Sequence, residues 1–162
     1  MKKNEPIWSS LVLGMHDALV STLGLVTGLA FAAATQYVII LTGMIAAMSA
    51  GMSMMASEYL SQKAGGNSRG AFMRGIMTGA AYVFTAAMLL VPFVLFRNPF
   101  IGVFATYLVG VAIIFGFNLL KSKMNAQKFL PAFAEMLFVC FVVTVVAFLI
   151  GESARILFGI SI

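Results

Sequence analysis

The hydrophobic positions of this chain fall into five long runs, separated by short polar or turn-forming links. Each run matches the roughly 20 helical residues that cross about 30 Å of hydrocarbon. No run alternates as the strands of a membrane barrel do, so the pattern predicts helices, which satisfy their own backbone polar groups in lipid. The five predicted membrane helices cover residues 8–33, 37–60, 71–96, 100–120 and 129–151.

The basic residues lie mostly on one side of the predicted membrane. Lys2, Lys3, Lys63, Arg69, Arg74, Lys121, Lys123 and Lys128 precede the first run or lie in or beside the second and fourth links. Only Arg97 and Arg155 fall on the other side. Because cytoplasmic loops are enriched in Lys and Arg, the N-terminus is predicted to be cytoplasmic and the C-terminus outside.

The composition agrees with an all-α integral membrane protein. Hydrophobic residues make up 62% of the chain and charged residues 9%, whereas soluble domains carry roughly 25% charged residues. The mean hydropathy is +1.05. We expect a single transmembrane domain over residues 1–162, whose first apolar run is a retained helix rather than a signal peptide.

Several functions are disfavoured by the motifs. The net charge of +5 is not arranged as a basic stripe with interleaved aromatics, so no nucleic-acid partner is expected. Cys140 stands alone, which excludes an intrachain disulfide. No phosphate-binding glycine loop and no zinc-ligand spacing occur. We therefore expect neither an enzyme nor a protein with a resident cofactor.

Small residues recur at four-residue spacing in three of the predicted helices. Such faces allow helices to approach closely in lipid. We expect them to pack the bundle, although one face could instead serve a dimer. The residues concerned are Gly24 and Gly28, then Gly43, Ala47 and Gly51, then Gly75 and Gly79.

Asp17 is the first candidate for a functional site. It lies nine residues after Trp8, about 13 Å along a helix, and no Lys or Arg nearby in the span is an obvious partner. A charge at that depth costs at least a few kcal/mol, so ion or proton handling is the functional interpretation. The structural alternative is a carboxyl group that is hydrogen-bonded by hydroxyls such as that of Ser21.

Glu58 is the second candidate, nearer the cytoplasmic end. It could reach the interface or pair with Lys63 instead. Met54 precedes it by four residues, so the two share a helix face. A carboxylate with a thioether suits a borderline divalent metal. Met52, Met54 and Met55 form a cluster, in which Met55 is a weaker candidate because Met is often only a gap-filler.

Four further polar residues lie in or beside the predicted helices. His16 is the only histidine and adjoins Asp17; it is a packed residue, a ligand or a proton acceptor. Glu135, in the cytoplasmic half of the fifth helix, either completes an acidic entrance with Glu58 or sits at the interface. Glu152 and Arg155, three residues apart, are predicted to form a surface ion pair.

Two segments resemble the vacuolar iron transporter family. Residues 14–22 read Gly-Met-His-Asp-Ala-Leu-Val-Ser-Thr, with Gly28 following, and are similar to the family's first-helix pattern of an Asp-Gly pair, a Ser/Thr pair and a later Gly. Residues 53–61 read Ser-Met-Met-Ala-Ser-Glu-Tyr-Leu-Ser and resemble the second-helix signature Ser-Met-x-x-Gly-Glu-Tyr-x-Ser. Arg74-Gly75 and Pro92-Phe93 in the third helix also fit.

The resemblance implies a homodimer of five-span subunits that exports Fe²⁺ or Mn²⁺ from the cytoplasm in exchange for protons. Asp17 and Met54 match the acid and the thioether of the family's translocation path. Glu58 matches the glutamate at the cytoplasmic end of the second helix. The metal is then a transported ion rather than a cofactor, and the partners are divalent metals, protons, lipid and a second copy.

The chain departs from the family pattern in four places. His16 replaces Asn, and Ala18 and Ser57 each replace Gly. The link over residues 61–70 contains no acid, so the family's Glu-rich cytoplasmic metal-collecting domain is absent. These departures favour the alternative of a non-transporting membrane assembly or scaffold protein that retains the fold. The short loops favour a prokaryotic plasma membrane over a vacuolar one.

Overall fold

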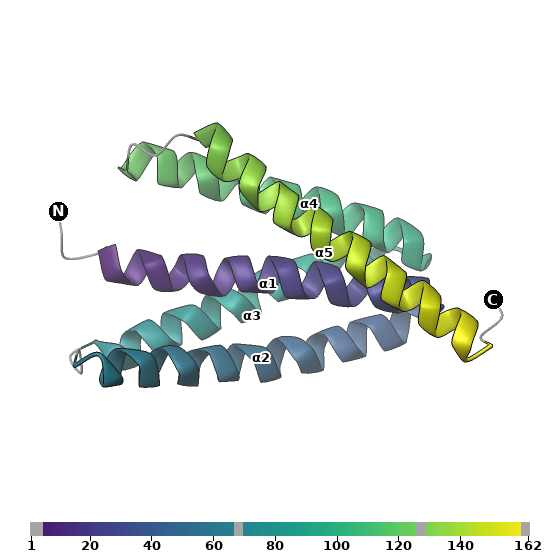
Figure 1. Ribbon diagram of the computed structural model, residues 1–162, viewed down its shortest axis with the longest axis horizontal. Helices are drawn as coiled ribbons and strands as arrows, with labels where there is room; N and C mark the ends of the chain where they lie inside the picture. The colour runs from purple at the N-terminus through teal and green to yellow at the C-terminus, as the bar shows by residue number, and fades with distance from the viewer. Residues whose placement is uncertain (1–4, 67–69, 126–128, 160–162) are drawn as a thin grey trace.

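The five predicted helices are present in the computed structural model, which describes residues 5–66, 70–125 and 129–159 (Figure 1). All five are long and apolar enough to cross a membrane, and the described residues contain no strand. Their bounds lie within a few residues of the prediction, except that the fourth and fifth run further. They are α1 Glu5–Phe31, α2 Gln36–Ala64, α3 Ala71–Leu95, α4 Pro99–Asn125 and α5 Phe129–Leu157.

Helix α1 occupies the centre of the bundle and contacts each of the other four helices. Helix α2 lies on one side of α1, and α4 lies on the other; α3 begins beside α2 and passes behind α1 toward α4 (Figure 1). Successive helices run in opposite directions, so α1 and α3 begin at the same end of the bundle at which α2 and α4 end. Helix α5 also begins at this end. The end of α5 lies at the opposite end.

The basic residues that set the predicted orientation are only partly described. Lys63 and Arg74 lie beside the α2–α3 link, at the end where α1 begins. Lys2, Lys3, Arg69 and Lys128 lie outside the described residues, and only the helical backbone of Lys121 and Lys123 is described. At the opposite end, Arg155 and Glu152 form the predicted ion pair at 2.5 Å.

Glycines bring α2 and α3 into close contact. A Cβ atom on Gly75 would lie 2.6 Å from the Met55 backbone oxygen, and one on Gly79 would lie 2.6 Å from the Gly51 oxygen. A Cβ on Gly43 would lie 2.6 Å from a methyl carbon of Leu90. The small-residue faces of these two helices therefore pack against one another, as expected for helices in lipid.

Glycines also allow α1 to approach two other helices closely, α3 and α5. A Cβ on Gly14 would lie 2.1 Å from the Thr78 backbone oxygen in α3. Towards α5, Gly28 is approached so closely that a Cβ on Gly151 would lie 2.3 Å from its oxygen. All three predicted small-residue faces thus contact helices of the same chain, which confirms their packing role.

Hydroxyl groups join the helices across the apolar interior. Thr27 of α1 is hydrogen-bonded to the Tyr107 hydroxyl of α4 at 3.0 Å, and that hydroxyl also contacts Thr144 of α5. Thr106 donates to the Leu89 backbone oxygen of α3 at 2.9 Å. Interhelical hydrogen bonds of this kind stabilise helix association in membranes.

The outer faces of the helices are apolar. Phe104, Phe138 and Leu149 are examples, with 66%, 66% and 56% of their surface exposed. Lipid chains can cover such side chains, whereas in water so many exposed large apolar groups would cause association. The five apolar helices and this outward apolar surface indicate an integral membrane protein.

The glycine contact at the centre of the bundle predicts a stability effect. We expect Gly14→Ala to lower stability by about 1–3 kcal/mol, because the backbone of Thr78 must move to admit a methyl group. Gly116→Ala is the matched control, since no atom lies within 4 Å of a Cβ built there. Thermal unfolding in detergent would measure both. Equal melting temperatures for Gly14→Ala and the wild type would contradict this account of the α1–α3 contact.

Candidate metal and proton site

Asp17 lies on α1 with its side chain exposed. The Ser21 hydroxyl hydrogen-bonds the backbone oxygen of Asp17 at 2.6 Å and the Tyr82 hydroxyl at 2.7 Å, not the Asp17 carboxylate. The expected structural alternative, a carboxyl group satisfied by Ser21, is therefore not what is found. Within the described chain, the Asp17 carboxylate has neither a hydrogen bond nor an ion pair.

The exposed face of α1 around Asp17 carries several polar residues. Ser9, Leu13, Asp17 and Ser21 follow at four-residue spacing and are all exposed. Residues at that spacing lie one above another on a helix. Asp17 is thus part of a largely polar stripe, which we call the α1 stripe, in a helix otherwise suited to lipid.

Glu58 of α2 has hydrogen-bond partners on two helices. Its Oε1 accepts from the Ser10 hydroxyl of α1 and from Nε2 of Gln62, both at 3.1 Å. The Gln62 amide oxygen in turn accepts from the Arg74 guanidinium of α3. The pairing with Lys63 is not formed; Lys63 lies over the Tyr59 ring instead, at 5.7 Å.

Glu58 and Asp17 lie at different levels of the bundle. Glu58 is hydrogen-bonded to Ser10, and Asp17 follows Ser10 by seven residues, about 10 Å along the helix. The two carboxylates that the sequence singles out therefore do not form one site. They occupy two successive levels, with Glu58 nearer the end where α1 begins.

Met54 of α2 lies close to the level of Asp17 in α1. It is partly buried against the cluster of Ala18, Ala47, Tyr82 and Ala86. That cluster contains the residue next to Asp17 and the tyrosine bonded to Ser21. Met55, by contrast, has 37% of its surface exposed, and the main chain at Met55 contacts Gly75 of α3.

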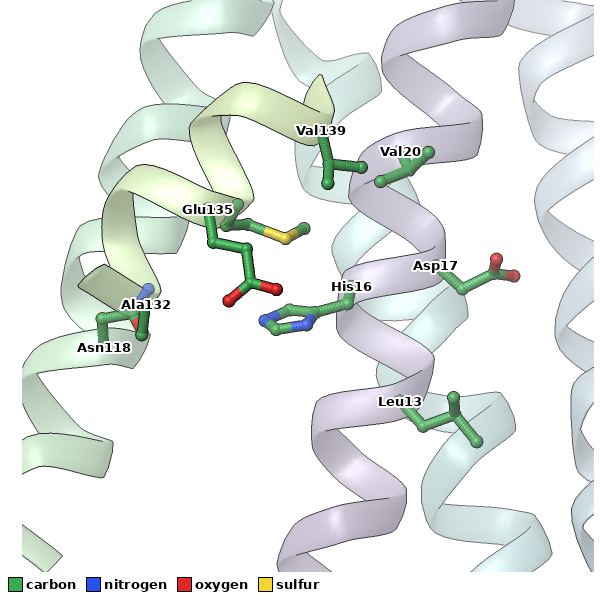
Figure 2. Close-up of a pocket in the computed structure, with 9 residues that line it drawn as sticks. Leu13, His16, Asp17, Val20, Asn118, Ala132, Glu135 and Val139 are labelled. Atoms are coloured by element: carbon green, nitrogen blue, oxygen red, sulfur yellow. The ribbon is translucent and has the colours of Figure 1, made fainter. Parts of the chain in front are cut away.

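A cleft of about 430 Å³ lies on the other side of α1, between α1, α4 and α5. The His16 ring and the Glu135 carboxylate point toward one another across it, whereas the Asp17 carboxylate points to the other side of α1 (Figure 2). Joint chelation by the adjacent His16 and Asp17 is not favoured by this geometry. The lining residues are Leu13, His16, Asp17, Val20, Asn118, Ala132, Glu135, Met136 and Val139.

Glu135 lines this cleft rather than an entrance shared with Glu58. Glu58 bonds to α1 and, through Gln62, to α3, and no α2 residue lines the cleft. Of the two alternatives left open for Glu135, this arrangement does not favour the joint acidic entrance, because α1 lies between the two side chains. Sequence reasoning also did not predict that the side chains of His16 and Glu135 face each other. The two residues are 119 positions apart, and no local pattern indicates that they are close in space.

The described residues contain no group of three or more His, Cys, Asp or Glu side chains that could hold a metal ion. What they offer is a carboxylate without a partner at Asp17, a thioether nearby at Met54, and an imidazole facing a carboxylate. Hydroxyl groups, water or a second subunit would have to complete a metal's coordination sphere at either position.

Comparison with known proteins adds one finding. The model of the VIT family matches residues 8–71, which take in α1 from Trp8, all of α2 and the first residue of α3. No curated protein matches the chain. The matched segment includes Asp17, Met54 and Glu58.

The hydrogen bonds of Glu58 predict how its substitutions differ. Glu58→Gln keeps a side-chain oxygen that accepts from Ser10 and Gln62, whereas Glu58→Ala leaves both donors without that acceptor. We expect the alanine variant to be less stable than the glutamine variant by on the order of 1 kcal/mol. Thermal unfolding in detergent would compare them. If the two variants melt together, the bonds to Glu58 contribute nothing to the fold.

Proposed function

We propose that the chain, whose residues 8–71 match the model of the VIT family, exports divalent metal from the cytoplasm, Fe²⁺ or Mn²⁺, in exchange for protons. The family suggests membrane metal-ion transport; the ions, the direction and the coupling are our proposal. The observation that carries it is the Asp17 carboxylate, which lies within a membrane-spanning helix without a partner among the described residues. A cation bound there would offset the cost of keeping that charge at membrane depth.

Asp17 and Met54 are the proposed ligands from one subunit. The carboxylate oxygen alone would accept Mg²⁺, Ca²⁺ or Mn²⁺, whereas a thioether favours softer borderline ions such as Fe²⁺. Met54 packs on the cluster that includes Ala18 and Tyr82, so a modest rearrangement would bring its sulfur to an ion on Asp17. The hydroxyl groups of Ser21 and Tyr82 are close enough to each other to position water there.

Proton coupling follows from the chemistry of the same carboxylate. A metal binds the ionised form of a carboxyl group, so binding releases the proton that the acid held. Protons and metal therefore compete for Asp17. A proton gradient directed into the cytoplasm would displace the ion on the far side of the membrane and drive export.

Glu58 supplies the proposed entrance. It lies at the end of the bundle that the positive-inside rule assigns to the cytoplasm, about 10 Å before Asp17 along α1. Its negative charge would attract a cation, while the link through Gln62 to Arg74 limits how strongly the ion is held. An ion bound only weakly at Glu58 can move on to Asp17, as an entrance site requires.

A homodimer is the proposed assembly. In a lone subunit the α1 stripe, with its Asp17 carboxylate, would face hydrocarbon. Helix α2 adds the exposed residues Ser49, Ser53 and Ser57 at the same four-residue spacing. A second copy that covers these polar surfaces would remove them from lipid and could supply further ligands to an ion at Asp17.

Transport is tested by flux into liposomes. Purified protein is reconstituted around a metal-sensitive dye, and Fe²⁺, Mn²⁺ or Co²⁺ is added under an imposed pH gradient. We expect metal entry that depends on the gradient, and a reduction of roughly tenfold or more in Asp17→Asn, because the loss of even an outer-shell partner costs about that much in metal affinity.

Glu152→Gln is the control for that experiment. Glu152 pairs with Arg155 at the far end of α5, so this variant should transport like the wild type. Absence of entry for every metal in both gradient directions would favour the non-transporting scaffold protein. Entry that Asp17→Asn leaves unchanged would remove Asp17 from the pathway while keeping the transport proposal.

The assembly is tested by the mass of the protein in detergent. Light scattering with the detergent contribution subtracted should give about twice the 17.3 kDa of one chain. A protein mass of one chain over a range of concentrations and in more than one mild detergent would argue against the homodimer.

A further inference from the structure

We propose that the cleft between α1 and α5 is a second divalent-cation site, distinct from Asp17 and Met54, with His16 and Glu135 as its ligands. This inference extends the proposed transport function, because it adds a binding site for the same class of ion. Neither the family pattern nor the spacing of the residues points to the pairing, since the family usually has Asn at the position of His16.

The charge of the cleft favours a cation. Among the described residues, the groups that point into the cleft include the Glu135 carboxylate and the His16 imidazole, and the described lining contains no Lys or Arg. Glu135 belongs to a helix that can span a membrane. Since uncompensated charge is costly at membrane depth, a divalent ion would balance what the lining residues leave unbalanced.

The geometry presents two ligands from different helices. The His16 imidazole and the Glu135 carboxylate point into the cleft toward one another (Figure 2). The His16 ring is held edge-on against Phe117 of α4, with ring centroids 5.9 Å apart. An imidazole that is packed on one side keeps the direction of its nitrogen atoms, which a metal ligand requires.

The donor set selects the class of ion. An imidazole nitrogen together with a carboxylate oxygen suits Mn²⁺, Fe²⁺, Co²⁺ or Zn²⁺ better than Mg²⁺ or Ca²⁺, which prefer oxygen alone. The volume of about 430 Å³ equals that of roughly fourteen waters at about 30 Å³ each. A partly hydrated ion therefore fits, and two protein ligands would hold it weakly enough to be released.

The cleft is separate from the site proposed at Asp17. The Asp17 carboxylate points away from Glu135 to the other side of α1 (Figure 2), and Met54 packs with residues of α1, α2 and α3. A single ion could not be bound by both pairs of ligands. The two sites would lie at the same level on opposite sides of α1.

The test uses pulsed electron paramagnetic resonance of Mn²⁺ bound to the full chain, purified with any affinity tag removed. His16 is the only histidine, so a strong ¹⁴N modulation from a coordinated imidazole can arise only there. We expect this modulation in the wild type, its loss in His16→Asn, and Mn²⁺ binding weakened by roughly tenfold or more in Glu135→Gln. Asp17→Asn should keep the modulation.

Gel filtration would confirm that each variant is folded, and His16→Asn introduces the residue that the family usually carries. Bound Mn²⁺ without histidine-dependent modulation in the wild type would overturn the site, as would wild-type affinity in Glu135→Gln. Flux without modulation would refute this site and leave the transport proposal standing. Modulation without flux would do the reverse.

Discussion

The close approach of α1 to α3 at Gly14 is the contact on which the arrangement of the polar residues depends. With no side chain at this position, the α1 backbone comes to a distance at which a Cβ would lie 2.1 Å from the Thr78 oxygen. The same face of the bundle brings Ser21 into hydrogen-bond contact with Tyr82. Helix α1 is thereby held in the middle of the bundle, with Asp17 and His16 directed to different sides of it.

The acids of this chain meet the cost of charge near lipid in different ways. Glu152 forms an ion pair with Arg155. Glu58 accepts two hydrogen bonds, and one of the donors, Gln62, accepts a hydrogen bond from Arg74. Glu135 faces an imidazole (Figure 2). Neither Glu135 nor Asp17 has an ion pair or a hydrogen bond to its carboxylate among the described residues, and for this reason each is proposed to bind a cation.

Residue patterns were sufficient for the membrane helices and for the packing role of the glycine faces. The length of each apolar run is a local property, and so is four-residue spacing on a helix. The same local reasoning marked Asp17 as an acid in need of a cation. It left open whether Glu135 joins Glu58 or sits at the interface, because the order of helices around α1 is not encoded in any one helix.

Taken alone, the sequence determined that the chain forms five membrane helices and that Asp17 lies deep within the first, since both depend only on hydrophobic length and distance along a helix. Tertiary structure decided which groups meet: Ser10 and Gln62 at Glu58, Tyr82 at Ser21, and His16 opposite Glu135. The physical reason is that such meetings depend on how closely the helices approach and how each is rotated. Those quantities are set by small residues on facing helices acting together.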